Sequence, residues 1–178
     1  LGANHPGEVA ALAALARPTV GLVTNAGAEH LEGFGSLDGV ARAEGELFEA
    51  LGPGATAVIN ADDAYAGLWR DMAGAARVVT FGTGAADLRA REVRLSVEGG
   101  RWSTRFVLDT PAGVAQLRLA LPGAHNVANA AGAAAAAMAC GATLEQVVDG
   151  LARVEPVAGR LQLKAGAAGA WIVDDSYN

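Results

Sequence analysis

The chain has 178 residues, enough for one domain with a substantial hydrophobic core. Hydrophobic residues make up 52% of it and charged residues 18%, a composition that excludes a disordered protein. The net charge of −6 indicates no basic nucleic-acid surface, and the longest apolar run is shorter than the roughly 18–20 residues that span a bilayer. We therefore expect a cytoplasmic monomer that neither binds nucleic acid nor inserts into a membrane.

The first part of the chain alternates predicted helices and strands. Short apolar runs rich in β-branched residues predict buried strands at residues 19–24, 55–59 and 77–81. Segments of helix-forming composition predict helices at residues 8–16, 36–51 and 62–73. Residues 25–35 are expected to form a loop, and Ser36 is expected to cap the helix that follows it. Because such an alternation joins strands through helical crossovers, it predicts an α/β fold with a mostly parallel sheet flanked by helices.

A different pattern covers residues 87–121, where apolar and polar residues alternate. Gly99-Gly100 is a two-residue hairpin turn between two of the alternating runs. The pattern predicts a small antiparallel meander with one wet face, attached to the parallel sheet. The expected elements beyond it are helices at 126–139 and 144–154 and strands near 161–164 and 170–173. The single cysteine, Cys140, lies in an alanine-rich stretch and is expected to be a buried, inert thiol.

Polar residues follow the first predicted strand, at the edge where open α/β sheets bind ligands. His30 lies in this loop with Glu32, and a neutral imidazole there can hold a divalent metal. The alternative is a loop histidine in solvent. Glu44 lies within the apolar stripe predicted for helix 36–51, where a buried carboxylate costs several kcal/mol unless it is compensated. Glu44 therefore either pairs with a buried arginine or takes part in metal or phosphate chemistry.

The second half of the chain carries two further candidates. Asn126 and Asn129 are three residues apart near a helix start, so they share a face and suit a planar base. The alternative is that Asn126 only caps the helix. Asp174 and Asp175 directly follow an apolar strand that we expect to be buried, where one acid can bind ribose hydroxyls. Arg160, before the preceding strand, is a candidate phosphate-binding cation.

Four segments together resemble the Mur ligase family: LGANHPGEV (1–9), AEHLEGFGS (28–36), PGAHNVANA (122–130) and VDDSYN (173–178). The resemblance covers essentially the whole chain. It implies that residues 1–178 are a partial central ATP-binding domain, with the phosphate loop and both flanking domains outside the chain, since no Gly-rich phosphate loop motif occurs in it. The fragment alone is then expected to be inactive.

The resemblance also implies an activity in peptidoglycan precursor synthesis. ATP phosphorylates a peptide carboxylate and an incoming amine displaces the phosphate, giving an amide, ADP and phosphate, with Mg²⁺ neutralising charge. The first and last segments indicate UDP-N-acetylmuramoyl-tripeptide and D-alanyl-D-alanine as the substrates. The alternatives are a sister ligase that adds the third stem residue, folylpolyglutamate synthase, a non-catalytic nucleotide-binding paralogue and a purely structural domain.

The resemblance assigns roles to individual positions. These are His30 and Glu44 at Mg²⁺, Asn126, Asn129 and His125 near the adenine, Asp175 at the ribose, Arg160 at the terminal phosphate, and Asn4 and His5 on the substrate side. Glu44 and Arg160 are the expected catalytic residues. Family members usually carry a carbamylated lysine where Glu44 stands, so we expect the glutamate to supply the negative charge instead, possibly through a bridging water.

Overall fold

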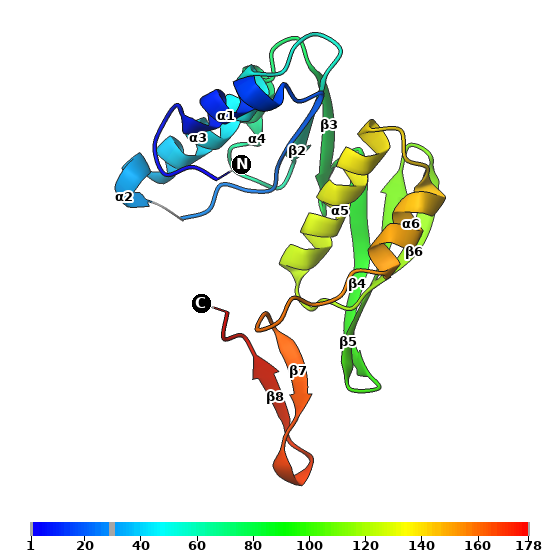
Figure 1. Cartoon of the computed structure of the whole chain (residues 1–178). Coiled ribbons are helices and arrows are strands. Elements are labelled where there is room, and N and C mark those ends of the chain that lie inside the picture. The colour runs from blue at the N-terminus through cyan, green and yellow to red at the C-terminus, as the bar shows by residue number, and fades with distance from the viewer. Residues whose placement is uncertain (1, 29–30, 178) are drawn as a thin grey trace.

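A computed structural model of the chain describes residues 2–28 and 31–177 (Figure 1). Its main sheet has six strands in the order β1-β2-β3-β4-β5-β6. The strands are β1 (Val20–Val23), β2 (Thr56–Asn60), β3 (Arg77–Gly82), β4 (Leu88–Glu98), β5 (Arg101–Thr110) and β6 (Gly113–Leu119). β1 to β4 are parallel to their neighbours, whereas β4, β5 and β6 pair antiparallel. The predicted fold class is therefore confirmed, with the meander joined edge to edge to the parallel strands.

Helices cover both faces of the parallel strands. Because successive residues of β2 point to opposite faces, they enter two separate cores. Ile59 packs with Phe48 and Trp69 beneath α3 (Leu37–Glu49) and α4 (Ala66–Met72), while α1 (Glu8–Ala16) packs against α3. On the other face, Val58 belongs to a second core beneath α5 (Ala124–Ala139) and α6 (Leu144–Ala152). Each fully buried large side chain in these cores stabilises the fold by about 1.5–3 kcal/mol.

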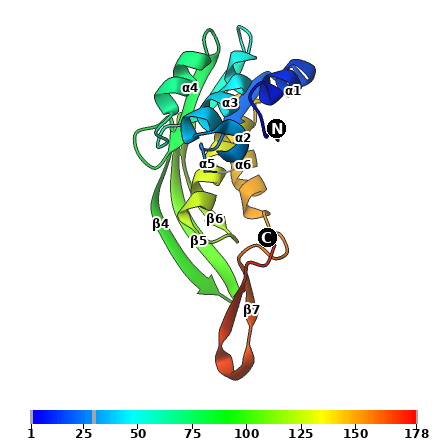
Figure 2. The same cartoon turned by 90° about the vertical axis from the view of Figure 1, so that its left-hand side faces the viewer.

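Alanine and glycine let α5 lie close to the sheet. A Cβ built on Gly132 would stand 3.0 Å from the ring of Phe81, which is fully buried. Figure 2 shows α5 and α6 together on one face of the meander. Among the described residues, no helix combines the length and apolar character needed to cross a bilayer.

The last two strands form a separate hairpin, β7 (Gln162–Ala165) and β8 (Trp171–Asp174), with a 3-10 turn at Ala167–Gly169 between them. The hairpin extends away from the main sheet (Figures 1 and 2). The expectation that β8 is buried is wrong: Trp171, Ile172 and Val173 are 53%, 54% and 49% exposed, because β7 is the only described strand that pairs with β8. The hairpin is attached to the meander through the Trp102 indole, which donates to the Leu161 carbonyl at 2.7 Å.

Several local predictions are confirmed and others are corrected. Ser36 caps α3 by accepting from the Gly39 amide at 3.1 Å, and Gly99-Gly100 forms the predicted turn with both φ angles positive. The predicted helix at 62–73 begins only at Ala66, and the loop predicted at 25–35 contains the short helix α2 (Leu31–Phe34). Cys140 is exposed, not buried, because it ends α5 where the chain turns away from the core.

Candidate functional site

A hydrogen-bond network ties together the carboxyl ends of β1, β2 and β3. The Asn60 amide donates to the Thr24 carbonyl at 2.8 Å and accepts from the Asp62 amide at 3.0 Å. The Asp62 carboxylate accepts from the Thr83 hydroxyl at 2.8 Å and from the Gly84 amide at 3.0 Å. Although partial burial opposes it, hydrogen bonds from Thr83 and Gly84 lower the pKa of Asp62. The strand ends are therefore held in a fixed relation.

Asp63 extends this network to the loop that follows β1. Its carboxylate accepts from the Ala26 amide at 2.9 Å and from the Tyr65 amide at 2.8 Å. The helix predicted at residues 62–73 includes Asp63, so its role in joining two loops was missed. Its signal was Asn60-Ala61-Asp62-Asp63 directly after a buried strand, a pattern of side chains that bind backbone amides in turns. The predicted metal ligand His30 follows this loop and lies outside the described residues.

The predicted substrate-side residues Asn4 and His5 are held in place by Glu8, at the start of α1. One Glu8 oxygen accepts from the backbone amides of Asn4 and His5, at 2.7 and 3.3 Å, and the other lies 3.2 Å from the His5 ring nitrogen Nδ1. The Asn4 amide, followed by the contacts with His5, lowers the pKa of Glu8. A Cβ on Gly33 would meet the Asn4 carbonyl at 1.9 Å. The N-terminal segment therefore lies against α2.

Glu44 lies on α3 and is half-buried. The apolar stripe predicted around it is only partly correct, because Leu37 is 40% exposed whereas Val40 and Phe48 are buried. The helix is fixed against α1 by Glu46, whose carboxylate accepts from the Gly7 and Ala10 amides at 2.7 and 3.0 Å.

The donor chemistry around Glu44 fits magnesium only when phosphate takes part. With residues 29 and 30 left aside, no described group of three or more His, Cys, Asp or Glu side chains could hold a metal ion. Mg²⁺ is usually held by one or two carboxylates together with substrate phosphates and waters. The Glu44 carboxylate therefore supplies a ligand type that Mg²⁺ prefers, and phosphate oxygens would complete the site.

The predicted adenine residues stand at the start of α5. Gly123 precedes the helix with a φ of 95° and without a side-chain cap, so the interpretation of Asn126 as the cap is wrong. The Asn126 amide nitrogen donates to the Pro122 carbonyl at 2.7 Å and lies 3.1 Å from Nε2 of His125. Asn126 is half-buried, whereas His125 and Asn129 are exposed. Side-chain amides and an imidazole thus surround a helix start whose first backbone N–H groups are free of intrahelical partners.

Arg160 and Asp175 are brought together although 14 residues separate their loops. The Leu161 amide donates to the Asp175 carboxylate at 3.2 Å, and the Tyr177 amide donates to the Gly159 carbonyl at 2.9 Å. The Arg160 guanidinium carbon lies 4.1 Å from the centre of the Tyr177 ring, a cation–π contact. Beside them, a hydrogen bond from Lys164, followed by one from Ser176, lowers the pKa of Asp174 to about 2.

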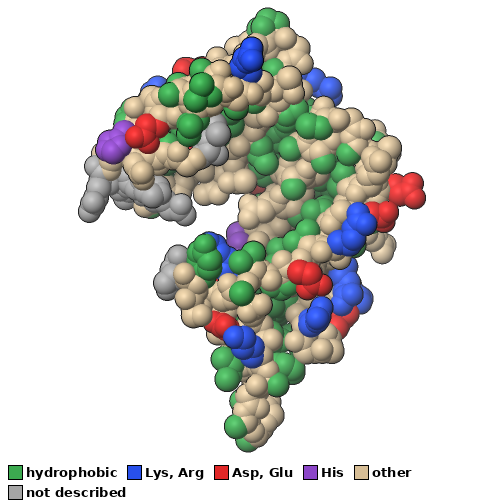
Figure 3. Space-filling view, viewed as in Figure 1, with side chains coloured by type: hydrophobic (Ala, Val, Ile, Leu, Met, Phe, Trp, Pro, Cys, Tyr) green, Lys and Arg blue, Asp and Glu red, His purple; other side chains and the backbone are tan. Residues whose placement is uncertain are grey.

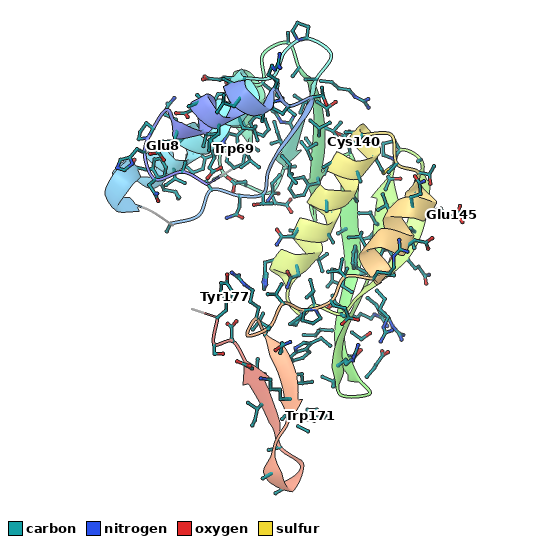
Figure 4. The ribbon with its side chains drawn as sticks, viewed as in Figure 1. Glu8, Trp69, Cys140, Glu145, Trp171 and Tyr177 are labelled. Atoms are coloured by element: carbon teal, nitrogen blue, oxygen red, sulfur yellow. The ribbon has the colours of Figure 1, made fainter. Side chains whose placement is uncertain are left out.

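These groups face one hollow of the molecule. The carboxyl ends of the parallel strands, the start of α5 and the C-terminal segment all point toward the space between the α1–α4 part and the β7–β8 hairpin (Figure 1). Figure 3 shows this space as a hollow in the surface. Figure 4 places Glu8 and Tyr177 on its opposite sides. The carboxyl ends of the parallel strands, the start of α5 and the C-terminal segment therefore border a common opening.

Residues 1–137 match the model of the Mur ligase middle domain, so the chain belongs to the Mur ligase family. The UDP-N-acetylmuramoyl-tripeptide–D-alanyl-D-alanine ligase of Escherichia coli is 44% identical over the whole chain, which covers 39% of that protein. The UDP-N-acetylmuramate–L-alanine ligase of Kineococcus radiotolerans is 40% identical over 89% of this chain and 33% of its own length. The crystal structure of MurF from Acinetobacter baumannii superimposes with a TM-score of 0.92 at 36% identity, over 100% of this chain and 38% of that one. The chain thus spans roughly two-fifths of the length of the UDP-N-acetylmuramoyl-tripeptide–D-alanyl-D-alanine ligases that it matches.

Proposed function

We propose that this chain is the central nucleotide-binding part of an ATP-dependent ligase that joins D-alanyl-D-alanine to UDP-N-acetylmuramoyl-tripeptide. The observation that carries the proposal is the 44% identity to the Escherichia coli ligase over the entire chain. The position of the start of α5 and of the C-terminal segment beside one hollow supports it. The phosphate loop and the two flanking domains belong, in this proposal, to the longer protein. That protein is expected to act as a monomer in the cytoplasm.

The described residues account for the binding of a nucleotide. Asn126 and Asn129 offer amide donors and acceptors to the adenine edge, and the exposed imidazole of His125 stands beside them. The Asp175 carboxylate accepts hydrogen bonds from ribose hydroxyls. Arg160 exchanges its stacking on Tyr177 for the terminal phosphate, for which a guanidinium is well suited.

The reaction then proceeds in two displacements. A carboxylate oxygen of the tripeptide attacks the terminal phosphorus of ATP, the bond to the bridging oxygen breaks and ADP leaves. The amine of D-alanyl-D-alanine attacks the resulting acyl phosphate, losing a proton as phosphate departs, and an amide forms. Arg160 stabilises the charge on the transferring phosphoryl group. Mg²⁺, held by Glu44 and His30, would neutralise phosphate charge when bound.

A ligation assay on the whole protein that contains this chain tests the proposal. With ATP and UDP-N-acetylmuramoyl-tripeptide present, D-alanyl-D-alanine is expected to be consumed and ADP released, while single amino acids are not. Ligation of a single amino acid to a shorter precursor would favour a sister ligase instead, a candidate supported by the similarity to the L-alanine ligase. The absence of any ATP-dependent ligation would contradict both. The isolated 178-residue chain is expected to show no activity.

We further propose that the Glu44 carboxylate takes the place of a carbamylated lysine. Glu44→Gln in the whole protein is expected to lower turnover by about 10–100-fold and to raise the Mg²⁺ concentration needed for half-maximal rate. Glu44→Lys is the matched variant, because its activity should depend on added bicarbonate. If Glu44→Gln leaves both turnover and Mg²⁺ dependence intact, this role is wrong.

A further inference from the structure

The meander concentrates positive charge on its outer face. Residues 88–119 contain six of the 13 basic residues of the chain and only three of its 19 acidic residues, in a protein with a net charge of −6. Ala90, Phe106 and Leu117 point into the core beneath α5 and α6. The alternate positions of the strands point the other way, and all six arginines occupy those positions: Arg89, Arg91, Arg94, Arg101, Arg105 and Arg118.

Three of these arginines form a row across three strands. Arg94 pairs directly with Arg105, and Arg105 pairs directly with Arg118. Neighbouring strands lie about 4.8 Å apart, so the row extends over about 10 Å. Like charges directly opposite each other destabilise a sheet. A row of this kind therefore has an electrostatic cost that its neighbours or a ligand must offset.

The neighbouring acids offset only part of this charge. Glu98 lies 3.0 Å from Arg105 and 3.4 Å from Arg118, and Arg118 also donates to the Ser103 hydroxyl at 2.9 Å. Although loss of water opposes it, contacts with Ser96, Arg105 and Arg118 lower the pKa of Glu98. One carboxylate thus serves two guanidinium groups. Within residues 2–28 and 31–177, no ion pair is found for Arg94.

The row lies in a hollow of the outer face. The hollow has a volume of about 520 Å³ and is lined by Arg94, Arg105, Arg118, Glu92, Val107 and Gln116, among others. A volume of this size suits a small ligand and not a protein partner. Arginine binds phosphate oxygens with two parallel hydrogen bonds, and a ligand with several phosphates can contact the whole row.

We propose that the row Arg94–Arg105–Arg118 binds an oligophosphate, either inorganic or carried by a nucleotide. The site lies on the meander, apart from the hollow around the start of α5, and it does not depend on the proposed ligase activity. Its chemistry is the pairing of three guanidinium groups with a ligand that carries at least two adjacent phosphates. No bond is made or broken.

Titration calorimetry of the 178-residue chain with sodium tripolyphosphate, without magnesium and in about 0.1 M salt, tests the proposal. Saturable binding is expected, and it should weaken strongly in about 0.5 M salt because the contacts are ionic. Arg94→Gln should lower the affinity by about tenfold or more, and Arg94→Gln/Arg118→Gln should abolish binding. The matched control is Arg70→Gln/Arg153→Gln, which removes two exposed arginines from α4 and the end of α6.

Thermal unfolding supplies a second measurement. Without ligand, Arg94→Gln/Arg118→Gln should unfold within a few degrees of the unsubstituted chain, because the relief of like-charge repulsion is opposed by the loss of the Arg118 contacts with Glu98 and Ser103. Tripolyphosphate should raise the unfolding temperature of the unsubstituted chain and of the control, but not that of the double variant. Uridine triphosphate tested in the same way distinguishes a nucleotide from an inorganic ligand, and binding of either to the row supports the site.

Each of three results would overturn the proposal. The first is the absence of saturable binding by the unsubstituted chain, and the second is equal binding by the double variant and the control. The third is equally tight binding of citrate, since three carboxylates would then serve as well as phosphates.

Discussion

The strands β2 and β8 are similar in sequence but very different in environment. Each is a short apolar run followed by polar residues, Asn60-Ala61-Asp62-Asp63 after β2 and Asp174-Asp175 at the end of β8. β2 lies between two parallel neighbours and is buried at every position. β8 pairs only with β7 among the described strands, and its first three residues are exposed. An apolar run therefore predicts that a strand forms, but not which strands it pairs with.

The polar residues that follow the two strands differ in the same way. At the end of β2 and just after it, the side chains bind the Thr24 carbonyl and backbone amides of neighbouring loops and so fix the edge of the sheet. After β8, Asp174 binds Lys164 of the same hairpin, and Asp175 accepts from the Leu161 amide. The first group is structural, whereas the second remains accessible to a ligand.

Truncation of one isoleucine in each strand should give the largest difference in unfolding free energy between β2 and β8. Ile59, which is 0% exposed, and Ile172, which is 54% exposed, have the same side chain. Ile59→Ala is expected to lower the free energy of unfolding by about 2–5 kcal/mol, because it leaves a cavity. Ile172→Ala should change it by less than about 0.5 kcal/mol. Urea unfolding of both variants checks this, and equal losses would show that β8 is buried in solution.

Removal of one polar group after each strand should have a smaller effect. Asn60→Ala is expected to cost about 1–3 kcal/mol of unfolding free energy, because the Thr24 carbonyl and the Asp62 amide lose their partner. Asp175→Ala should change the stability by less than about 0.5 kcal/mol. In the whole protein, the same Asp175→Ala variant should weaken ATP binding if its proposed role at the ribose is correct. A stability loss at Asp175 as large as that at Asn60 would remove the distinction between the two edges.

The smallest expected effect is on the stability of the β7–β8 hairpin at low pH. The pKa of Asp174 is lowered from 3.8 to about 2 by the hydrogen bond from Lys164, followed by that from Ser176. Because the folded-state pKa is the lower one, the ionised carboxylate stabilises the hairpin fully above pH 3.8, and this contribution is lost as the pH falls through about 2. Amide chemical shifts of β7 and β8, recorded by NMR from pH 5 to pH 1.5, should follow this titration. Asp174→Asn should remove it, and an unchanged titration in that variant would assign it to another group.

Most of the fold could be predicted from the sequence, because local patterns determine it. The alternation in residues 87–121, the Gly99-Gly100 turn and the Ser36 cap each specify one local conformation, and the structure contains all three. The start of α4 could not be predicted from helix propensity, since Asp62 and Asp63 bind distant amides instead of starting the helix. The isolation of β8 depends on which strands are available to pair, which no local pattern records.

The candidate site was predictable only as a set of residues at strand ends and helix starts. That rule led to the start of α5 and to the C-terminal segment, which border one opening of the structure, whereas His30 lies outside the described residues. Contacts between segments, such as Asp63 with the loop after β1, were missed because they join residues distant in the sequence. The arginine row was missed for a related reason. Three different strands supply one arginine each to the row, so the cluster on the surface leaves no basic run in the sequence.

The exposed position of Cys140 has a practical consequence for ligand-binding measurements. It is the only cysteine in the chain, and it follows the 16 residues of α5 whose first turn carries His125 and Asn126. At a rise of about 1.5 Å per residue, Cys140 is about 21–23 Å along the helix from that first turn. A single maleimide fluorophore can therefore be attached without any substitution. The fluorophore would report on events at the opposite end of α5 without occupying the hollow around the start of that helix.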